Sequence, residues 1–534
     1  MEKQLGRKLD SGRVELGRVL FFDRFLGLHN DNSCSGCHSP TAGFGDTQSI
    51  AIGVDNNGVV GPGRGGPRNQ RRTPSVINNA FYPRLMLNGR FAAVSGNPFD
   101  NSKGFFFPEP EGTVRFPPND PRFVHLLQAQ AHIPFTELPE MAGFSKIRET
   151  SFTSSRFQTA AQGQGSVSLF AAEKSAEPRL DAKAPTRLLV FPQRTPRLSL
   201  KEAKEKEDAP VVDFTKFDHP PHGAHGVPLP PPLVTQLPDD TVQEFRNEPI
   251  RDVVAGRLNA NEAYRREFAK VFPEVAKGGP ISFDMVGQAI AEFEFSLTFA
   301  NAPIDRFARG ERSAMTAQQK QGALLFFGKA NCAACHAARS KSPDGGEFHH
   351  EMFSDFEMRV IGVPQIAPRF GVDAAGKPTG NVPFRNDKGQ FTEDGTQDFG
   401  LEDITADPAD RYKFRTSPLR NISLQPAFFH NGAFTRLEDA IRHHLNVKGS
   451  IQTYSAASAG VASDLRAIQG PTEPVLQRLD PLLAKPVALT DDEFKALVAF
   501  VRDGLLDPRA KPQNLRKQVP KKLPSGQPLQ KFEF

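Results

Sequence analysis

Two short cysteine motifs constrain this 534-residue chain more than any other feature of its sequence. The chain has four cysteines, and each pair has the spacing Cys-x-x-Cys-His. The motifs comprise Cys34, Cys37 and His38 in one half of the chain and Cys332, Cys335 and His336 in the other. Two thiols at this spacing reach the two vinyl groups on one edge of a porphyrin, and the histidine that follows lies beneath the ring as an iron ligand. The spacing therefore predicts two covalently bound heme c groups.

Three other interpretations explain these motifs less well. A disulfide inside each pair, as in thioredoxin-like redox sites, does not need a histidine after both pairs. A zinc site built from all four cysteines also leaves the two histidines without a role. Cysteines with a purely structural role would not cluster in this way.

The segments before the two motifs repeat one another. Residues 17–22 read Gly-Arg-Val-Leu-Phe-Phe, and residues 322–327 read Gly-Ala-Leu-Leu-Phe-Phe. Each string is typical of the end of an amphipathic helix that leads into a heme-binding loop. Thr490 and Glu493 form a capping box that opens a later helix, of the kind that packs on a c-type heme. These patterns predict a mainly α fold with two cytochrome-c-like heme domains and long loops.

Composition and motif positions divide the chain into five segments. We predict an N-terminal cytochrome c domain at 1–144, its helical continuation at 236–310, a C-terminal cytochrome c domain at 311–510 and a tail at 511–534. Residues 145–235 are rich in Ser, Ala, Lys and Pro. We expect them to form a large insertion in the N-terminal half, extended or partly mobile.

Charge and hydropathy argue against two classes of partner. The 66 basic and 61 acidic residues give a net charge of +5 and are spread along the chain, so no block of like charge points to nucleic acid. No stretch approaches the ~18 consecutive apolar residues of a membrane span. Heme is attached outside the cytoplasm in bacteria, whereas the sequence starts without an apolar signal region. We therefore expect a periplasmic or otherwise exported protein whose signal peptide is absent from this chain.

Several further strings occur in an order that is typical of one protein family. They are residues 16–23 (Leu-Gly-Arg-Val-Leu-Phe-Phe-Asp), 72–78 (Arg-Thr-Pro-Ser-Val-Ile-Asn), 88–90 (Asn-Gly-Arg), 326–329 (Phe-Phe-Gly-Lys), 418–421 (Pro-Leu-Arg-Asn) and 429–432 (Phe-His-Asn-Gly). In them the sequence resembles the bacterial di-heme cytochrome c peroxidase family, which also contains the di-heme enzyme that matures the tryptophylquinone cofactor of methylamine dehydrogenase. The resemblance implies that one heme reduces hydrogen peroxide and that the other transfers electrons from a small redox protein.

The resemblance assigns the peroxide site to the N-terminal heme, with His38 as its proximal ligand. In closed members of the family a distal histidine lies in the loop after the motif, and Val54 stands at that position here. The first heme is therefore expected to be five-coordinate or water-bound. The family places a catalytic glutamate six residues after a proline. Pro134 and Glu140 reproduce that spacing, and Glu137 is the alternative acid/base.

The second heme needs a distal ligand downstream of His336. The family takes a methionine or a tyrosine near the end of the helix that follows residues 429–432. His444 falls on the apolar face of that predicted helix, whereas His443 points away from it by about 100°. We expect His444 to complete a low-spin, bis-histidine heme with a lower potential than a methionine-ligated one. The alternative ligands are His443, His430, Met352 and Met358.

Two further positions depart from the family. A tryptophan that the family places between the hemes is replaced by Leu87, and the chain contains no tryptophan at all. Tyr82 is the nearest aromatic candidate by sequence for part of an electron path. The family also binds calcium between its domains, partly through an asparagine, and Arg72 stands at that position here. Calcium is therefore kept only as a candidate cofactor.

The leading functional prediction is a di-heme c-type peroxidase that reduces hydrogen peroxide at the N-terminal heme with electrons relayed by the C-terminal heme. One alternative is a multiheme electron-transfer cytochrome without peroxide chemistry. Another is a di-heme oxidase or oxygenase that acts on an organic substrate. The sequence leaves the oligomeric state open, with a homodimer as one alternative.

Overall fold

The structure of the chain is a computed structural model, and it describes most residues outside the predicted insertion. The described residues are 1–107, 116–142, 248–338, 351–368 and 397–534, together with the residue pairs 147–148, 212–213, 340–341 and 347–348. The prediction of an insertion at 145–235 therefore falls almost entirely outside the described residues.

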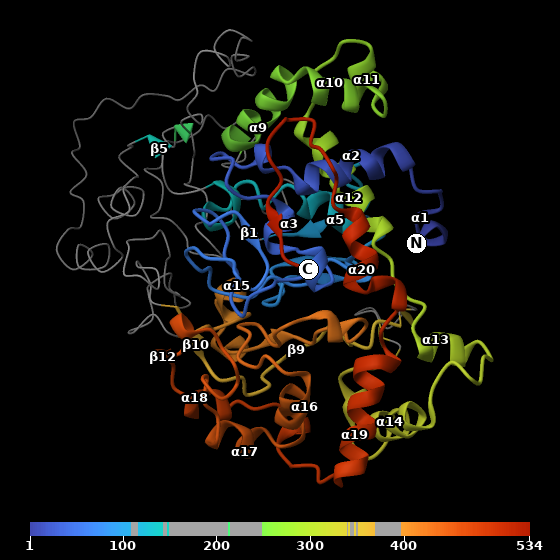
Figure 1. The fold of residues 1–534 in the computed structure, drawn as a ribbon, viewed down its shortest axis with the longest axis vertical. Coiled ribbons are helices and arrows are strands. Elements are labelled where there is room, and N and C mark those ends of the chain that lie inside the picture. The colour runs from blue at the N-terminus through green and yellow to red at the C-terminus, as the bar shows by residue number, and fades with distance from the viewer. Residues whose placement is uncertain are drawn as a thin grey trace, which may run out of the picture.

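Helices dominate the described part of the chain, which confirms the prediction of a mainly α fold (Figure 1). The helices of the N-terminal half are α1 (Glu2–Leu5), α2 (Ser11–Phe22), α3 (Cys34–Cys37), α5 (Leu126–Gln130), α9 (Glu248–Ala260), α10 (Glu262–Ala269), α11 (Pro273–Ala276) and α12 (Phe283–Ser296). They are followed by α13 (Pro303–Ala308), α14 (Ala317–Phe327), α15 (Glu402–Thr405), α16 (Leu437–Leu445), α17 (Val447–Gln452), α18 (Glu473–Leu476), α19 (Asp491–Ala499) and α20 (Pro512–Leu515). No helix among the described residues is both long and apolar enough to cross a membrane.

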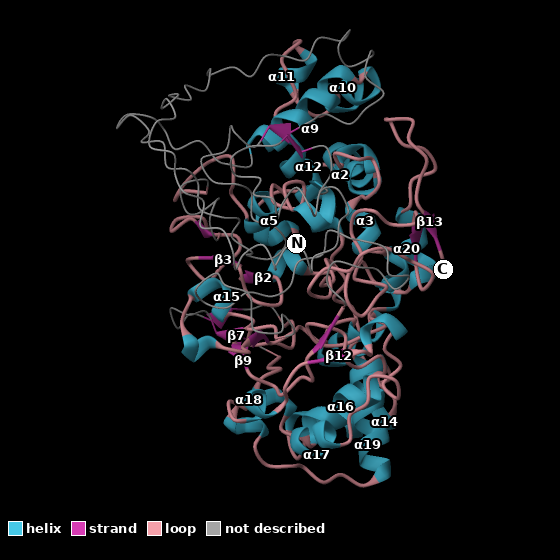
Figure 2. Ribbon diagram, turned by 90° about the vertical axis from the view of Figure 1, so that its left-hand side faces the viewer, coloured by secondary structure: helices cyan, strands magenta, loops and turns pink. Residues whose placement is uncertain are grey.

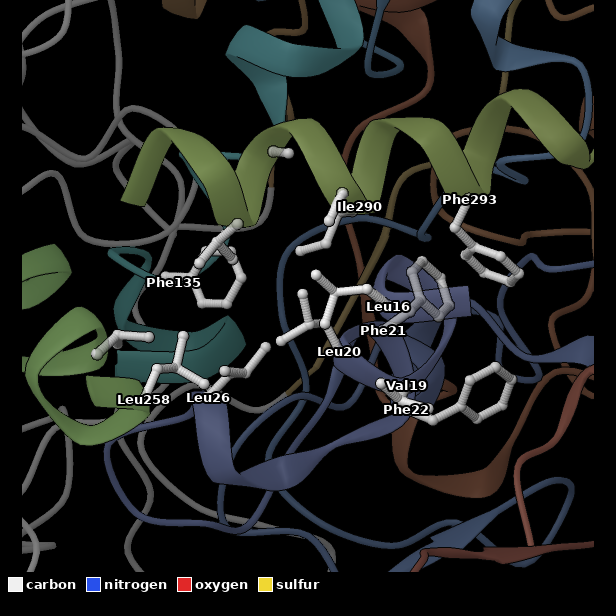
Figure 3. Close-up of a cluster of buried hydrophobic side chains, with 14 of the residues drawn as sticks. Leu16, Val19, Leu20, Phe21, Phe22, Leu26, Phe135, Leu258, Ile290 and Phe293 are labelled. Atoms are coloured by element: carbon white, nitrogen blue, oxygen red, sulfur yellow. The ribbon is translucent and has the colours of Figure 1, made fainter. Parts of the chain in front are cut away.

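The N-terminal core forms where α2 crosses α12. Gly17 lies at the crossing, and a Cβ atom there would come within 1.8 Å of the Ala289 carbonyl oxygen. Glycine is therefore required for the two backbones to approach so closely. Figure 3 shows Phe21 of α2 facing Phe293 of α12, and their ring centres lie 5.3 Å apart. This packing fixes the end of α2, which leads into the first cysteine motif.

The second half repeats this arrangement with α14 and α19. Gly322 lies at their crossing, and a Cβ atom there would come within 1.9 Å of the Ala496 carbonyl oxygen. The rings of Phe326 and Phe500 pack 5.3 Å apart, as Phe21 and Phe293 do in the first half. The repeated glycine and phenylalanines of the sequence thus have the same physical role twice, because each set allows two helices to cross closely in front of a cysteine motif.

The strands are short and lie mostly between long loops (Figure 2). They are β1 (Val59–Val60), β2 (Arg84–Leu85), β3 (Phe91–Ala93), β4 (Phe105–Phe106), β5 (Ile147–Arg148), β6 (Val212–Asp213), β7 (Ser340–Lys341), β8 (Glu347–Phe348), β9 (Met358–Arg359), β10 (Ile366–Ala367), β11 (Phe414–Arg415), β12 (Ile468–Gln469) and β13 (Lys531–Phe532). The sheet β2-β3-β4 is antiparallel, and so is the pair of β9 and β11.

The end of the chain returns to the N-terminal half. β13 pairs in parallel with β1, with Val60 opposite Phe532. Leu515 and Leu523 are buried in the same apolar cluster as α2 and α12. Figure 1 shows this segment in red beside the blue N-terminal elements. The segment predicted as a tail thus contributes to the N-terminal core.

Candidate heme sites

The N-terminal cysteine motif borders a buried cavity of about 100 Å³. α3 places Cys34 and Cys37 one turn apart on its wall, and His38 follows directly. Burial lowers the pKa of His38 to about 4, so its imidazole is neutral, which is the form that binds iron. Two thiols and a neutral imidazole around one cavity fit the attachment of a heme.

The predicted acid/base residue lines the same cavity. Glu140 lies in the helical turn η4 (Leu138–Ala142), and both Glu140 and Pro134 border the space beside His38. The side-chain amide of Asn32 donates to the Glu140 carbonyl at 2.8 Å, which anchors the turn close to α3. The backbone N–H of Val54 donates to the carbonyl of Pro139 at 3.0 Å. Burial, and next the charge of Glu137, raises the pKa of Glu140 to about 8.

Glu137 has a different environment from Glu140, although only three residues separate them. Its side chain is buried and accepts a hydrogen bond from Arg90 at 2.9 Å. The guanidinium of Arg90 compensates the carboxylate charge there. Glu140 thus combines a raised pKa with a place beside the cavity, as expected for a proton-transfer group, whereas Glu137 is held by Arg90.

Glu294 also lines the first cavity, although no sequence motif singles it out. Its side chain on α12 is buried and accepts a hydrogen bond from Asn79 at 2.7 Å. Burial raises its pKa to about 7. By contrast, Glu292 on the same helix is paired with Arg7 through two bonds of 2.7 and 2.6 Å. The available signal was a glutamate between Phe293 and Phe295, at a position where an amphipathic helix is apolar.

We expect Glu294→Gln to change how stability depends on pH. Because the folded-state pKa is raised above the ordinary 4.5, the neutral carboxyl contributes stability that is fully present below pH 4.5 and is lost as the pH rises to about 7. Glutamine cannot ionise, so the variant should gain roughly 2–3 kcal/mol relative to the wild type across this window. Denaturant unfolding at several pH values measures the difference. For the control Glu274→Gln, on the exposed side of α11, the free energy of unfolding should depend on pH as it does in the wild type. The same pH dependence in Glu294→Gln would contradict the raised pKa of Glu294.

The second cysteine motif borders a larger cavity of about 260 Å³, where two histidines face each other. The ring centres of His336 and His444 lie 6.2 Å apart. A metal on the line between two imidazoles, with metal–nitrogen bonds of about 2 Å, separates the ring centres by roughly 6 Å. Nδ1 of His336 donates to the Phe353 carbonyl at 3.1 Å, and Nδ1 of His444 donates to the Ala440 carbonyl at 2.8 Å. These bonds leave Nε2 as the nitrogen of each ring that is available to a metal.

The alternative ligands have other surroundings. His443 uses both ring nitrogens, with Ser450 Oγ at 3.1 Å and the Ile361 carbonyl at 2.9 Å. His430 also borders the second cavity, but its ring is stacked on Phe414 with 3.6 Å between ring centres. Met352 is buried in a separate apolar cluster with Phe356 and Tyr82, and Met358 packs against Gly89. His444 is thus the alternative whose geometry fits a shared iron with His336.

A short wall separates the two cavities. The residues that border both are Arg72, Pro74, Ser75, Tyr82, Leu87 and Arg415. The Tyr82 hydroxyl donates to the Ile77 carbonyl at 3.1 Å, and burial raises its pKa to about 12. Leu87 and Tyr82, the positions singled out for the missing tryptophan, therefore both lie at the junction of the cavities.

The surroundings of Arg72 do not fit a calcium ion. Its guanidinium donates to the Gln48 carbonyl at 2.5 Å, to the Asp46 carbonyl at 2.9 Å and to Oε1 of Gln425 at 2.6 Å. These oxygens are the kind of ligands that calcium prefers, but the arginine already supplies the positive charge. In the described ranges, no group of three or more His, Cys, Asp or Glu side chains could hold a metal ion.

A mainly helical chain with two buried, histidine-lined cavities beside cysteine motifs has the features of a heme protein. Comparison with known families narrows this class. The family model described as "Di-haem cytochrome c peroxidase" matches residues 11–173 and 234–313. Over these residues the chain is similar to the di-haem cytochrome c peroxidase family.

Two curated relatives show the extent of this similarity. Cytochrome c551 peroxidase of Pseudomonas aeruginosa is 32% identical over 189 residues, which are 35% of this chain and 44% of that protein. The methylamine utilization protein MauG of Paracoccus denitrificans is 28% identical over 267 residues, which are 49% of this chain and 62% of that protein. The chain thus spans about half the length of the curated relatives it matches. A solved MauG-like protein associated with microbial copper homeostasis aligns over 94% of this chain and 92% of its own, at 19% identity and a TM-score of 0.46.

Proposed function

We propose that this chain is a di-heme c-type peroxidase that reduces hydrogen peroxide to water at its N-terminal heme. The observation that supports this proposal most strongly is the difference between the two cavities. The first combines His38 with a carboxyl group, Glu140, whose pKa is raised. In the second, the ring centres of His336 and His444 lie 6.2 Å apart, a separation that suits two ligands of one iron. One cavity is suited to chemistry on a small molecule, and the other to electron transfer.

Named residues would hold each heme. The first heme would be held by Cys34, Cys37 and His38, and the second by Cys332, Cys335, His336 and His444. Bound heme supplies the iron that accepts electrons and binds peroxide. Two electrons and two protons convert one peroxide into two water molecules, and a small redox protein supplies the electrons. Covalent heme attachment of this kind supports an exported, periplasmic location.

Glu140 handles the protons in this proposal. Its carboxylate would accept a proton from one oxygen of hydrogen peroxide and donate it to the oxygen that leaves as water. A pKa near 8 makes both directions accessible around neutral pH. Pro134 borders the same space, and its ring fixes its own backbone φ in the segment that leads to Glu140. Electrons cross the wall that contains Tyr82 and Leu87.

Electron paramagnetic resonance of the oxidised protein tests the proposal. We expect one high-spin ferric signal from the His38 heme and one low-spin signal from the His336/His444 heme. Hydrogen peroxide should remove the high-spin signal within seconds of mixing. Two low-spin signals that stay inert to peroxide, even after one-electron reduction, would instead identify an electron-transfer cytochrome.

A further inference from the structure

Arg415 lies at the junction of the two heme cavities. It belongs to β11, and its side chain is 5% exposed and borders both cavities. Its backbone is fixed from two sides: its N–H donates to the Leu87 carbonyl at 2.8 Å, and it pairs with Met358 of β9. The guanidinium is therefore held in one place, between the two sites and within reach of both.

The charge of this guanidinium is not compensated within the described protein. Its Nε donates to the Met86 carbonyl at 3.1 Å, and Nη1 is buried with no hydrogen-bond partner among the described residues. The rings of Tyr82 and Phe356 lie 5.4 and 5.8 Å from the guanidinium carbon. Burial lowers the pKa of Arg415 to about 10, still far above neutral, so the group is charged.

Arg420, a second buried arginine, has the kind of carboxylate partner that Arg415 lacks among the described residues. Arg420 is also buried and also borders the second cavity. Its two terminal nitrogens bind the carboxylate of Asp305 at 2.8 and 2.7 Å. A buried cation normally has such a partner, because an unpaired one loses its hydration without compensation. Nη1 of Arg415 has no such partner among the described residues, and the side chain borders both cavities.

We propose that Arg415 is the receptor for propionate carboxylates of the hemes, and that its charge raises their reduction potentials. Each heme carries two carboxylates, which a guanidinium binds through paired hydrogen bonds. A fixed positive charge favours the ferrous heme over the more positive ferric heme. Neutralising a propionate acts in the same direction, because an uncompensated carboxylate stabilises the ferric form. The inference rests on heme binding in both cavities, as in the proposed function, but not on peroxide turnover.

Potentiometric titration of the holoprotein, followed by the ferrous absorption bands, tests this role. Arg415→Gln should lower the ferrous-to-ferric ratio of at least one heme tenfold at a fixed poise, which is about 59 mV for one electron. A shift in one heme alone assigns the propionate to that heme. Arg415→Lys keeps the charge and should retain most of the wild-type potential. Arg266→Gln, which removes an exposed charge on α10, should leave both potentials unchanged.

Further variants keep the test decisive. Arg415→Met removes the same charge but fills the apolar space between Tyr82 and Phe356, so it replaces Arg415→Gln if that variant does not fold. Loss of heme from the Gln and Met variants, but not from Arg415→Lys, also supports a charged receptor. Titration curves that overlay the wild type at full heme content would overturn the proposal, as would loss of heme from all three variants. Heme content and spin state are measured on the same samples, and neither depends on peroxide turnover. A failure of the proposed peroxide chemistry would therefore leave the outcome of this test unchanged.

Discussion

Glu140→Gln is expected to slow peroxide reduction by roughly 100-fold to 10,000-fold, the usual contribution of a positioned acid/base group. Glutamine has nearly the same size as glutamate, so the variant keeps the turn η4 and its bond to Asn32, which uses the backbone carbonyl. Stopped-flow mixing of the reduced protein with peroxide measures the second-order rate constant. Heme content and the spin states should match those of the wild type, because Glu140 is not an expected iron ligand.

Glu137→Gln is the matched control, since it makes the same substitution three residues away. Glu137 is bound by Arg90, and its charge helps to raise the pKa of Glu140. The control should therefore retain most of the rate at high pH. A large loss in Glu137→Gln with little loss in Glu140→Gln would exchange the roles of the two carboxyl groups.

The same pair of carboxyl groups predicts a pH profile. A group that must first accept a proton acts in its ionised form, and the pKa of Glu140 is raised to about 8. The rate constant of peroxide reduction should therefore rise from pH 7 to 9 in the wild type. Removing the charge of Glu137 lowers that pKa, so the rise should move to lower pH in Glu137→Gln. A pH-independent rate in both proteins would exclude Glu140 as the proton acceptor.

Local sequence patterns were sufficient for the parts of the sites that lie within a few residues. The cysteine motifs are contiguous, and the helix ends at Gly17 and Gly322 repeat because both crossings need a residue without a Cβ. The expectation for His444 rested on helical spacing and on its position relative to the family's ligand. Leu437 and Ala440 are buried on α16, but so is His443, which the spacing had placed away from the apolar face. Such patterns are visible in sequence because each depends on spacing within one element.

Contacts between distant segments were not predictable in this way. Glu294 joins the first cavity because α12 crosses α2 and brings it close to Asn79, 215 residues earlier in the chain. Arg415 reaches the junction through the pairing of β11 with β9 and through Leu87. β13 returns to β1 across almost the whole chain. Among these residues only Glu294 has a local signal, because it stands between Phe293 and Phe295 on an apolar helix face. The local sequence around Arg415 and β13 does not distinguish them from an ordinary arginine or tail segment.

His444→Ala should convert the second heme from a low-spin to a high-spin form. The rings of His336 and His444 border the second cavity with their centres 6.2 Å apart, a separation that suits two ligands of one iron. Removing one ring therefore leaves a five-coordinate or water-bound site, and its potential should rise with the loss of a strong nitrogen ligand. Electronic absorption and resonance Raman spectra of the ferric protein measure the change. Added imidazole should enter the vacated space and restore the low-spin spectrum.

His443→Ala is the control from the adjacent position on α16. Both ring nitrogens of His443 are engaged by Ser450 and the Ile361 carbonyl, so its loss should leave the low-spin heme intact. It should instead lower the free energy of unfolding by roughly 1–3 kcal/mol, because the buried partners lose their hydrogen bonds. A low-spin spectrum that survives in His444→Ala but disappears in His443→Ala would reverse the assignment of the ligand. If both variants keep the low-spin heme, the second ligand comes from another residue, and His444 does not close the second cavity.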